Sequence, residues 1–581
     1  MKLFIVLLTG AFMLATGTSD VFAKKKEKVQ TEAKSDTVRT ASKKRNTQYP
    51  RLFKNKRVVT KKGLITIHKI DDKLYFEFPK SLLGREFLMG SSISATSDNT
   101  SGLVGQTMTT PLHIRFAIQE DQVYMQNVTP VSRMDVYSNQ SDISKAVAKS
   151  NITPDMESFK IAAYNMDSTA VVFEVTKFFL ADNKRLPLFD QNSSSLEDEK
   201  YGQLELKAVL KKNLSSIRNF YVFDDNLEIN LDMSFYQSLL ASKKEVRGGN
   251  VRVKAVYSML LLPEETMVWR LGDPRLGYTF TKKQKISTEK DGTAFSYLQH
   301  KWNLLPADEE AYRRGDLVAP RKPVVFYIDS DFPEAWKKAI KEGVNWWNEA
   351  FKMAGFKDAV QTADFPANDT TFYAGNLKYS CIRYVPVNLS KTQSKVWVDP
   401  RSGEIINGTI FVGHDIAKTI ASQRFVQTAQ VDERMRGIQL SEEVLLEGIR
   451  LYVAREVGHC LGLADNASAS AAFSVESLRS PEFTRQNGIA SSVMDELPYN
   501  YIAQPQDGKA DFIQNKLGAY DLFAIQMGYM LVPDAKTPEE IREKIMRWVS
   551  MKSGDPVYRY GKAQYQGAEY DPSALGGDLG N

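Results

Sequence analysis

The stretch from Ala454 to Asp465, Ala-Arg-Glu-Val-Gly-His-Cys-Leu-Gly-Leu-Ala-Asp, constrains the fold of this chain more than any other. Glu456 and His459 are three residues apart, so a helix places both side chains on one face. Glycine, here Gly462, is the residue that most often ends a helix. The stretch therefore predicts a helix that presents a carboxylate and an imidazole, followed by a loop that turns back and brings Asp465 close to them.

The residues before this stretch predict where the helix begins. Ser441 is a favoured N-cap residue, and Glu442 and Glu443 follow it in the first turn, where negative charge is stabilising. Apolar residues then recur at helical spacing and define the buried side of the helix: Leu445, Ile449, Tyr452 and Val453.

The pattern is close to the zinc-binding motif H-E-x-x-H-x-x-G-x-x-H. In the intact motif three histidines bind the metal, and the glutamate activates the metal-bound water. Here Arg455 occupies the first-ligand position, and arginine cannot bind a metal because it has no lone pair and stays protonated. The expected metal ligands are His459 and Asp465, with Glu456 as general base if the protein is active. We hypothesise that the Arg455 guanidinium replaces the metal and pairs with Asp465 or Glu456.

The N-terminal region has the features of an exported protein. Residues 1–23 contain Lys2, an apolar run from Leu3 to Ala15 and a small-residue site ending at Ala23, which together predict a secretory signal peptide. No later apolar run reaches the length of about 18 residues that a membrane span needs. We therefore expect a secreted or periplasmic protein without a transmembrane segment.

Residues 24–48 are expected to form a basic flexible tail. Between Lys24 and Lys62 there are fifteen Lys or Arg and three Asp or Glu residues, a net charge of +12, whereas the whole chain carries only +6. The body of the protein is thus acidic, which argues against a nucleic-acid partner. The tail is either a solvated segment or a contact with anionic envelope surfaces, and the sequence leaves both open.

The two cysteines, Cys381 and Cys460, are too few for a disulfide scaffold. Whether they pair with each other stays open. Cys460 follows His459 directly, but neighbours on a helix point about 100° apart, which disfavours a catalytic Cys–His pair.

The residue patterns predict an α+β protein, in which β-rich antiparallel N-terminal domains precede a domain of strands and helices. Alternating apolar and polar residues between Gly63 and Lys301 are typical of antiparallel sheet. Gly-, Ser- and Asn-rich breaks at Ser91–Gly105 and Gln191–Ser195 predict loops. We expect a small β-rich domain at 49–105, a β-rich antiparallel domain at 106–301 and a third domain at 302–581.

After Pro320 the pattern changes to alternating strands and helices. Val324–Ile328 is expected to be a buried strand, and Glu334–Met353 a helix that ends at Gly355. Further strands are predicted at Tyr379–Val385 and Lys395–Val398. A turn over Asp399–Glu404 then leads into a strand at Ile405–Val412, giving a hairpin.

A second mark lies beyond the helix. The residues Ser491-Ser492-Val493-Met494-Asp495 resemble the Met-turn that lies under the zinc site of metzincins. Together with the order of strands and helices, this indicates a zincin (metzincin-like) domain.

The chain also resembles, over most of its length, a bacterial family of secreted, zinc-dependent metalloproteases whose metzincin-like catalytic domain follows two β-rich domains of unknown function. The matching segments are Ser81–Phe87, Arg270–Tyr278, Asn348–Phe356, Asp399–Ile405, Asn500–Pro505 and Tyr520-Asp521. This resemblance implies a zincin fold, a peptide-binding cleft and zinc as the family's cofactor.

The chain departs from the family pattern, which looks like H-E-V-G-H-T-L-G-L-R-H-N across the motif. Arg455, Cys460, Ala464 and Asp465 differ from it, and Glu496 follows the Met-turn where the family has tyrosine. The chain is also expected to end early relative to the family. Zinc is therefore expected to be absent or weakly bound in this member.

Three functions remain open. The first is a pseudoprotease that has lost hydrolysis but binds peptides or proteins. For it, the strand Ile405–Val412 is the candidate edge strand that pairs with a peptide, with Ile405, Thr409 and Phe411 as contact residues. The second is a weakly active metallopeptidase with an atypical zinc site. The third is a non-enzymatic envelope structural or binding protein.

Overall fold

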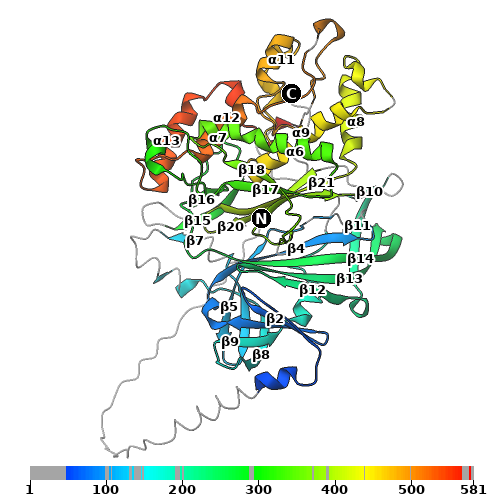
Figure 1. The fold of residues 1–581 in the computed structure, drawn as a ribbon, viewed down its shortest axis with the longest axis vertical. Coiled ribbons are helices and arrows are strands. Elements are labelled where there is room, and N and C mark those ends of the chain that lie inside the picture. Colours follow the sequence, from blue (N-terminus) through cyan, green and yellow to red (C-terminus); the bar gives the residue numbers. More distant parts are fainter. Residues whose placement is uncertain are drawn as a thin grey trace, which may run out of the picture.

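A computed structural model gives the fold of this α+β protein (Figure 1). It describes residues 48–98, 104–105, 107–129, 134–136, 145–146, 149–189, 196–198, 202–286, 294–369, 372–387, 392–437, 439–496, 499–508, 510–564 and 575–576. The expected signal peptide at 1–23 lies outside these residues, as does the basic tail apart from residue 48. The first part of the chain forms sheets in the lower half of Figure 1, and helices of the last part cover a second sheet above them.

The large sheet of the N-terminal half is antiparallel, as the alternating pattern predicts. Thirteen strands of the described residues join in one sheet, in the order β1-β2-β3-β9-β8-β6-β5-β4-β14-β13-β11-β10, with β12 paired to β13. These strands are β1 (Val58–Lys62), β2 (Thr66–Ile70), β3 (Lys73–Pro79), β4 (Glu86–Thr96), β5 (Leu112–Gln119), β6 (Gln122–Asn127), β8 (Asp155–Tyr164), β9 (Ala170–Glu174), β10 (Leu196–Asp198), β11 (Gly202–Leu210), β12 (Ser216–Val222), β13 (Asn226–Ala241) and β14 (Lys244–Leu261).

The stretches 49–105 and 106–301 share this sheet and one hydrophobic core. Phe78 and Phe87 of the first stretch pack with Phe116 and Phe173 of the second, with ring centroids 4.8 to 6.3 Å apart. The two stretches therefore share a core among the described residues.

The predicted loop at Ser91–Gly105 begins later than expected. Strand β4 continues to Thr96, because residues from Phe87 to Thr96 pair with the long strand β14. Tertiary pairing thus overrides the low strand propensity of Gly90, Ser91 and Ser92. The other predicted loop, Gln191–Ser195, lies outside the described residues.

The third part of the chain contains a five-stranded mixed sheet in the order β18-β17-β19-β21-β20. Strands β17, β18, β19 and β21 pair in parallel, and β20 pairs antiparallel to β21. Their bounds are β17 Val324–Ile328, β18 Val360–Asp364, β19 Ser380–Val385, β20 Thr392–Asp399 and β21 Glu404–Gly413. The predicted strands and the predicted hairpin are all present.

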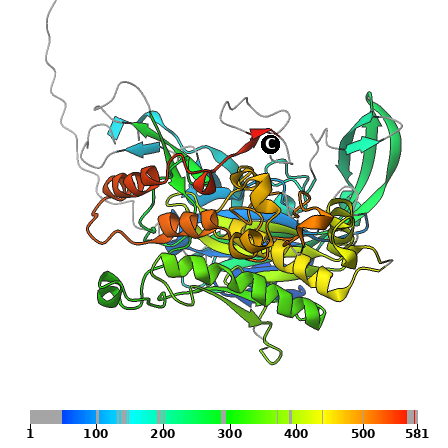
Figure 2. The ribbon, with the colours of Figure 1, turned by 90° about the horizontal axis from the view of Figure 1, so that it is seen from above.

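The helices of this part form a second layer over the sheet (Figures 1 and 2). The predicted helix Glu334–Met353 is divided at Trp346 into α6 and α7. The predicted motif helix is α9, and Ser441 caps it by accepting a hydrogen bond from the Val444 amide. The helix bounds are α6 Glu334–Asn345, α7 Trp347–Met353, α8 Ile416–Thr428, α9 Glu442–Cys460, α10 Val475–Leu478, α11 Pro481–Asn487, α12 Ala519–Tyr529 and α13 Pro538–Met551.

Candidate functional site: a degenerate metal centre

Buried contacts on one side of helix α9 fix the direction in which its polar face points. The Trp347 indole donates a hydrogen bond of 2.9 Å to the Ala454 carbonyl, and both residues are fully buried. Gly458 lies against Met494, so closely that a β-carbon at this position would collide with the Met494 sulfur. The residue expected in the Met-turn therefore packs directly under the helix that bears Arg455 and His459.

The loop after the helix returns as the sequence predicts. Gly462 adopts φ +96°, and a β-carbon there would collide with the His300 carbonyl, so both the backbone conformation and the space favour glycine. The loop is then pinned to an extended segment, because the Thr279 amide donates to the Gly462 carbonyl (2.8 Å) and the Ala464 amide donates to the Gly277 carbonyl (2.7 Å). These bonds place Asp465 beside the helix.

Arg455 pairs with Asp465. The guanidinium Nη2 is 2.5 Å from Asp465 Oδ1 and 3.8 Å from Glu496 Oε1. Of the two carboxylates that the sequence left open as its partner, the structure selects Asp465. Glu496, the residue that follows the Met-turn, adds a second negative charge on the same side of the guanidinium.

His459 contacts the same carboxylate. Its Nδ1 is 2.9 Å from the Leu463 carbonyl and must donate there, because a carbonyl oxygen only accepts. Its Nε2 is 3.2 Å from Asp465 Oδ1 and donates there when both ring nitrogens carry a proton. One carboxylate oxygen therefore lies close to both the guanidinium and the imidazole.

Arg455 and His459 lower the pKa of the Asp465 carboxyl. Burial by itself raises the pKa of this carboxyl, but the hydrogen bond from His459 and the positive charge of Arg455 outweigh it, so the pKa lies below the ordinary value. The carboxylate is thus held in its ionised form at neutral pH, as an anion shared between two partners.

Glu456 makes its hydrogen bond to the sheet rather than to Arg455 or Asp465. Its side chain is buried, and its Oε1 accepts a hydrogen bond of 2.9 Å from the Thr392 hydroxyl on β20. The expected general base is therefore tied to the sheet edge. Thr392 carried no motif signal, because its contact arises only where β20 crosses α9.

These residues do not fit a catalytic zinc site. Such a site uses three protein ligands and leaves a fourth position open. Here His459 and Asp465 are two donors. The remaining ligand position of the motif holds the Arg455 guanidinium, which is a cation and repels a metal ion. Among the described residues, no group of three or more His, Cys, Asp or Glu side chains is placed to hold a metal ion.

The expectation that Ile405–Val412 forms the sheet edge is wrong. Strand β21, which contains Ile405, Thr409 and Phe411, pairs with β19 on one side and with β20 on the other, so its backbone groups are used on both sides. The outer strands are β20, next to β21, and β18 at the opposite edge. The hairpin order was right, but which arm lies outside depends on the parallel pairing of β21 with β19, a contact between distant segments.

Phe411 also faces away from the helix. Its ring lies against Gly105, within 2.6 Å of where a β-carbon of that glycine would be, and the neighbouring Gln393 side chain donates to the Val104 carbonyl (2.9 Å). By contrast, Thr392 pairs with Val412 and Ser394 pairs with Ile410, both of which pack on the helix side. Residues 392 and 394 of β20 therefore face α9.

Both cysteines are free and buried. Burial raises the pKa of the Cys381 thiol to about 12 and raises that of Cys460 well above its ordinary value. Cys460 packs against Gly408 of β21. Neither thiol has the low pKa and exposure that a nucleophile needs.

A cavity of about 180 Å³ lies beside Arg455 and extends toward Gln514, with Tyr452 and Glu496 in its wall. The Arg455 Nε is buried and has no hydrogen-bond partner among the residues that the structure describes. One nitrogen of the guanidinium is therefore left over after the pair with Asp465 is made. No sequence motif indicated this cavity.

Three family models match the chain. A Met-zincin model matches residues 437–581, and two domains of unknown function match residues 105–307 (DUF5117) and 47–96 (DUF5118). No curated protein and no solved structure matches. None of the helices in the described ranges has the length and apolar character needed to cross a membrane.

Proposed function

This chain belongs to the metalloprotease family in which a Met-zincin domain follows two domains of unknown function, and we propose that it is a secreted pseudoprotease that binds peptides or proteins without cleaving them. The proposal rests mainly on the ion pair between Arg455 and Asp465, which stands where the family normally holds zinc. The helix, the glycine turn and the methionine under the helix are all retained around it.

The loss of zinc removes the means of activating water. A zinc ion lowers the pKa of its bound water from about 15.7 to about 7. At about 1.4 kcal/mol per pKa unit, forming hydroxide without the metal costs roughly 12 kcal/mol more. Glu456 alone does not offset this cost, and its carboxylate is engaged by Thr392.

The retained sheet supports peptide binding. Strand β20 is an outer strand, and an extended peptide can add to such an edge through backbone hydrogen bonds. Ser394, at the middle of its helix-facing side, would then lie beside the bound peptide. Ile405, Thr409 and Phe411 remain candidates only as residues that support β20 from the neighbouring strand.

Metal content tests the loss of the metal site. The purified protein without residues 1–23 is incubated with zinc, dialysed and measured by elemental analysis, with a Glu456→Ala/His459→Ala variant as control. We expect zinc near zero in both. Stoichiometric zinc that is lost in the control would contradict the proposal and support a metallopeptidase with an atypical site.

Photo-crosslinking tests peptide binding. Benzoylphenylalanine is placed at position 394 on β20 or, as a matched control, at position 409 on β21, and each protein is irradiated with a random decapeptide library. We expect crosslinks from position 394 and none from position 409. Absence of crosslinks from both positions would favour a structural role over peptide binding.

A further inference from the structure

A groove of about 930 Å³ lies between a β-hairpin and a helix of the last part of the chain, and no residue of the motif helix α9 lines it. The hairpin consists of β15 (Phe280–Ile286) and β16 (Ala294–Gln299), and the helix is α13. The segment 552–562 closes the groove on its third side. Its volume is within the range of ligand-binding pockets. We call it the aromatic groove.

Aromatic side chains line the hairpin side of the groove. Phe280 and Phe295 are each 53% exposed and Tyr297 is 39% exposed. Phe280 and Tyr297 pack edge to face, with ring centroids 4.8 Å apart. Single exposed apolar residues are ordinary, but three neighbours along one hollow indicate a surface that a ligand covers.

The opposite side of the groove is basic. The lining includes five Lys or Arg side chains and two Asp side chains, a net charge of +3. Asp273 is bound by the Arg275 guanidinium at 2.6 Å, and Asp555 accepts the Val557 amide at the start of a short 3-10 helix. Positive charge therefore remains on Arg542, Lys552, Arg559 and Lys562, all of which are exposed.

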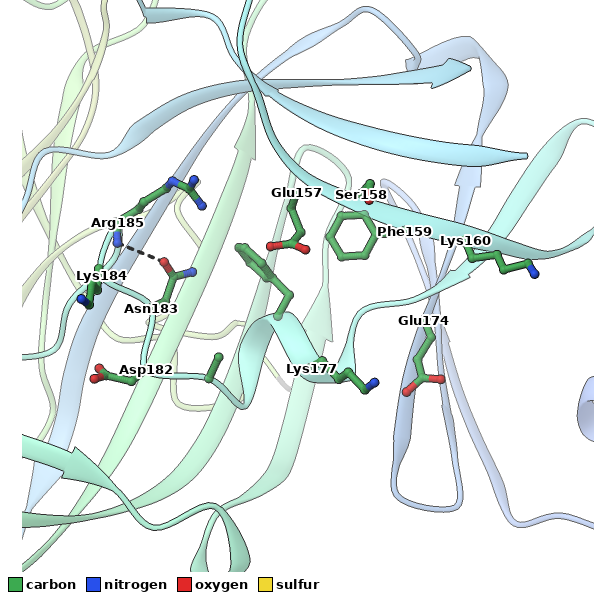
Figure 3. Close-up of a pocket in the computed structure, with 12 residues that line it drawn as sticks. Glu157, Ser158, Phe159, Lys160, Glu174, Lys177, Asp182, Asn183, Lys184 and Arg185 are labelled. Carbon is green, nitrogen blue, oxygen red and sulfur yellow. Dashed lines mark hydrogen bonds between the residues drawn. The ribbon is translucent and has the colours of Figure 1, made fainter. Parts of the chain in front are cut away.

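In a second pocket of the protein, acidic and basic residues are mixed, and no basic side faces an aromatic side. The pocket beside β8 and β9 in Figure 3 mixes Glu157, Glu174 and Asp182 with basic residues, among them Lys160 and Arg185. Glu174 there also forms an ion pair of 2.9 Å with Lys73. Nothing in that pocket selects one charge of ligand.

We propose that the aromatic groove binds an extended acidic peptide segment of a partner protein, in which carboxylates alternate with aromatic or large apolar side chains. The rings of Phe280, Phe295 and Tyr297 bury the apolar side chains, and the cations on α13 and the segment after it neutralise the carboxylates. Buried aromatic anchors with a charged rim are typical of peptide and protein interfaces.

The charge of the chain disfavours one other anionic ligand. Nucleic acid uses basic grooves with stacked aromatics, yet the body of this chain is acidic outside residues 24–62, which repels a polyanion as it approaches. A short acidic peptide meets the local positive charge with far less repulsion.

The groove is independent of the cleft function proposed above, because no residue of the Arg455 cluster lines it. Its failure as a binding site would leave the pseudoprotease proposal untouched, and the reverse also holds.

Fluorescence anisotropy tests the groove. The probe is a fluorescein-labelled peptide, Gly-Glu-Phe-Glu-Gly-Glu-Phe-Glu, and it is compared with peptides in which lysine replaces glutamate or serine replaces phenylalanine. We expect the first peptide to bind and both others to bind at least about tenfold more weakly, because each lacks one of the two matching features. Binding of the lysine peptide as tightly as the glutamate peptide would overturn the proposal.

Variants locate the site. Lys552→Glu and Phe295→Ser should each weaken the probe roughly tenfold, whereas Arg547→Glu on the same helix and Phe425→Ser, a ring of similar exposure at 55%, should have no effect. Thermal unfolding checks that all four variants are folded. Equal weakening by the control variants would refute an acidic-peptide site. Tighter binding of oligo(dT) or polygalacturonate than of the probe would refute it as well. So would the absence of probe binding at about 1 mM, a concentration at which even weak peptide binding is measurable.

Discussion

Replacing Arg455 with histidine should restore a metal site. The change removes the guanidinium that lies 2.5 Å from Asp465 and places an imidazole four residues before His459, on the same face of α9. Together with Asp465 this gives three donors and an open position, the number that a catalytic zinc site uses. The variant should bind zinc, and the native protein should not.

The size of the effect follows from linkage. Zinc at 100 times its dissociation constant would stabilise the variant by about 2.7 kcal/mol. For a cooperative unit of 150–250 residues this corresponds to a rise of roughly 5 to 11 °C in Tm. The Arg455–Asp465 pair is partly exposed, with side chains 21% and 33% accessible, so its removal should cost no more than about 1 kcal/mol without metal. The zinc-dependent gain therefore exceeds the cost of the substitution.

The assay is thermal unfolding with and without zinc, together with elemental analysis. The matched control is Arg450→His on the same helix, because Arg450 pairs with Glu342 and lies outside the cluster. The reasoning is refuted if the native protein shows the same zinc-dependent rise as Arg455→His, or if Arg450→His gains zinc as readily. No rise in Arg455→His would show that Asp465 and His459 are not placed as metal ligands.

Three further predictions concern the surroundings of the site. Asp465→Asn should destabilise the protein by about 1 kcal/mol at pH 7, because it leaves Arg455 and His459 without their anion in a partly exposed cluster. Since the folded pKa of Asp465 is depressed, its contribution is present above the ordinary Asp pKa of about 4 and is lost as pH falls through the lower folded value. Urea titrations should therefore show native and variant proteins converging at low pH, and a constant difference would contradict this. Gly458→Ala should lower the free energy of unfolding by about 1–3 kcal/mol, because its β-carbon would meet Met494 and lie 2.7 Å from a Trp347 ring carbon. The control is Gly437→Ala, whose β-carbon has space. Equal denaturation midpoints of the two variants would refute the packing. A thiol reagent should label neither Cys381 nor Cys460 in the folded protein and both in urea, and rapid labelling before unfolding would show that their burial is not maintained.

Local patterns predicted most of the elements around the site. Ser441 caps α9, Gly462 ends its turn with positive φ, and the strand at Val324–Ile328 has the predicted bounds. These features depend on residues close in sequence, so the chain itself encodes them. The hypothesis that Arg455 pairs with a carboxylate followed from arginine standing where the zinc motif has a ligand, and it left Asp465 and Glu456 open.

What the sequence by itself determined is therefore the type of several elements around the site and the match to a Met-zincin family model, together with an arginine where the zinc motif has its first histidine. Only the tertiary structure decided that Arg455 pairs with Asp465, that Glu456 is held by Thr392 and that β20 is an outer strand. It also brought the hairpin β15–β16 against α13, two segments about 250 residues apart, to form the aromatic groove. Arg455 and Asp465 are ten residues apart and meet because the loop after α9 is hydrogen-bonded to residues 277–279. The other contacts join distant parts of the chain and depend on how whole sheets and helices pack, which local periodicity does not record.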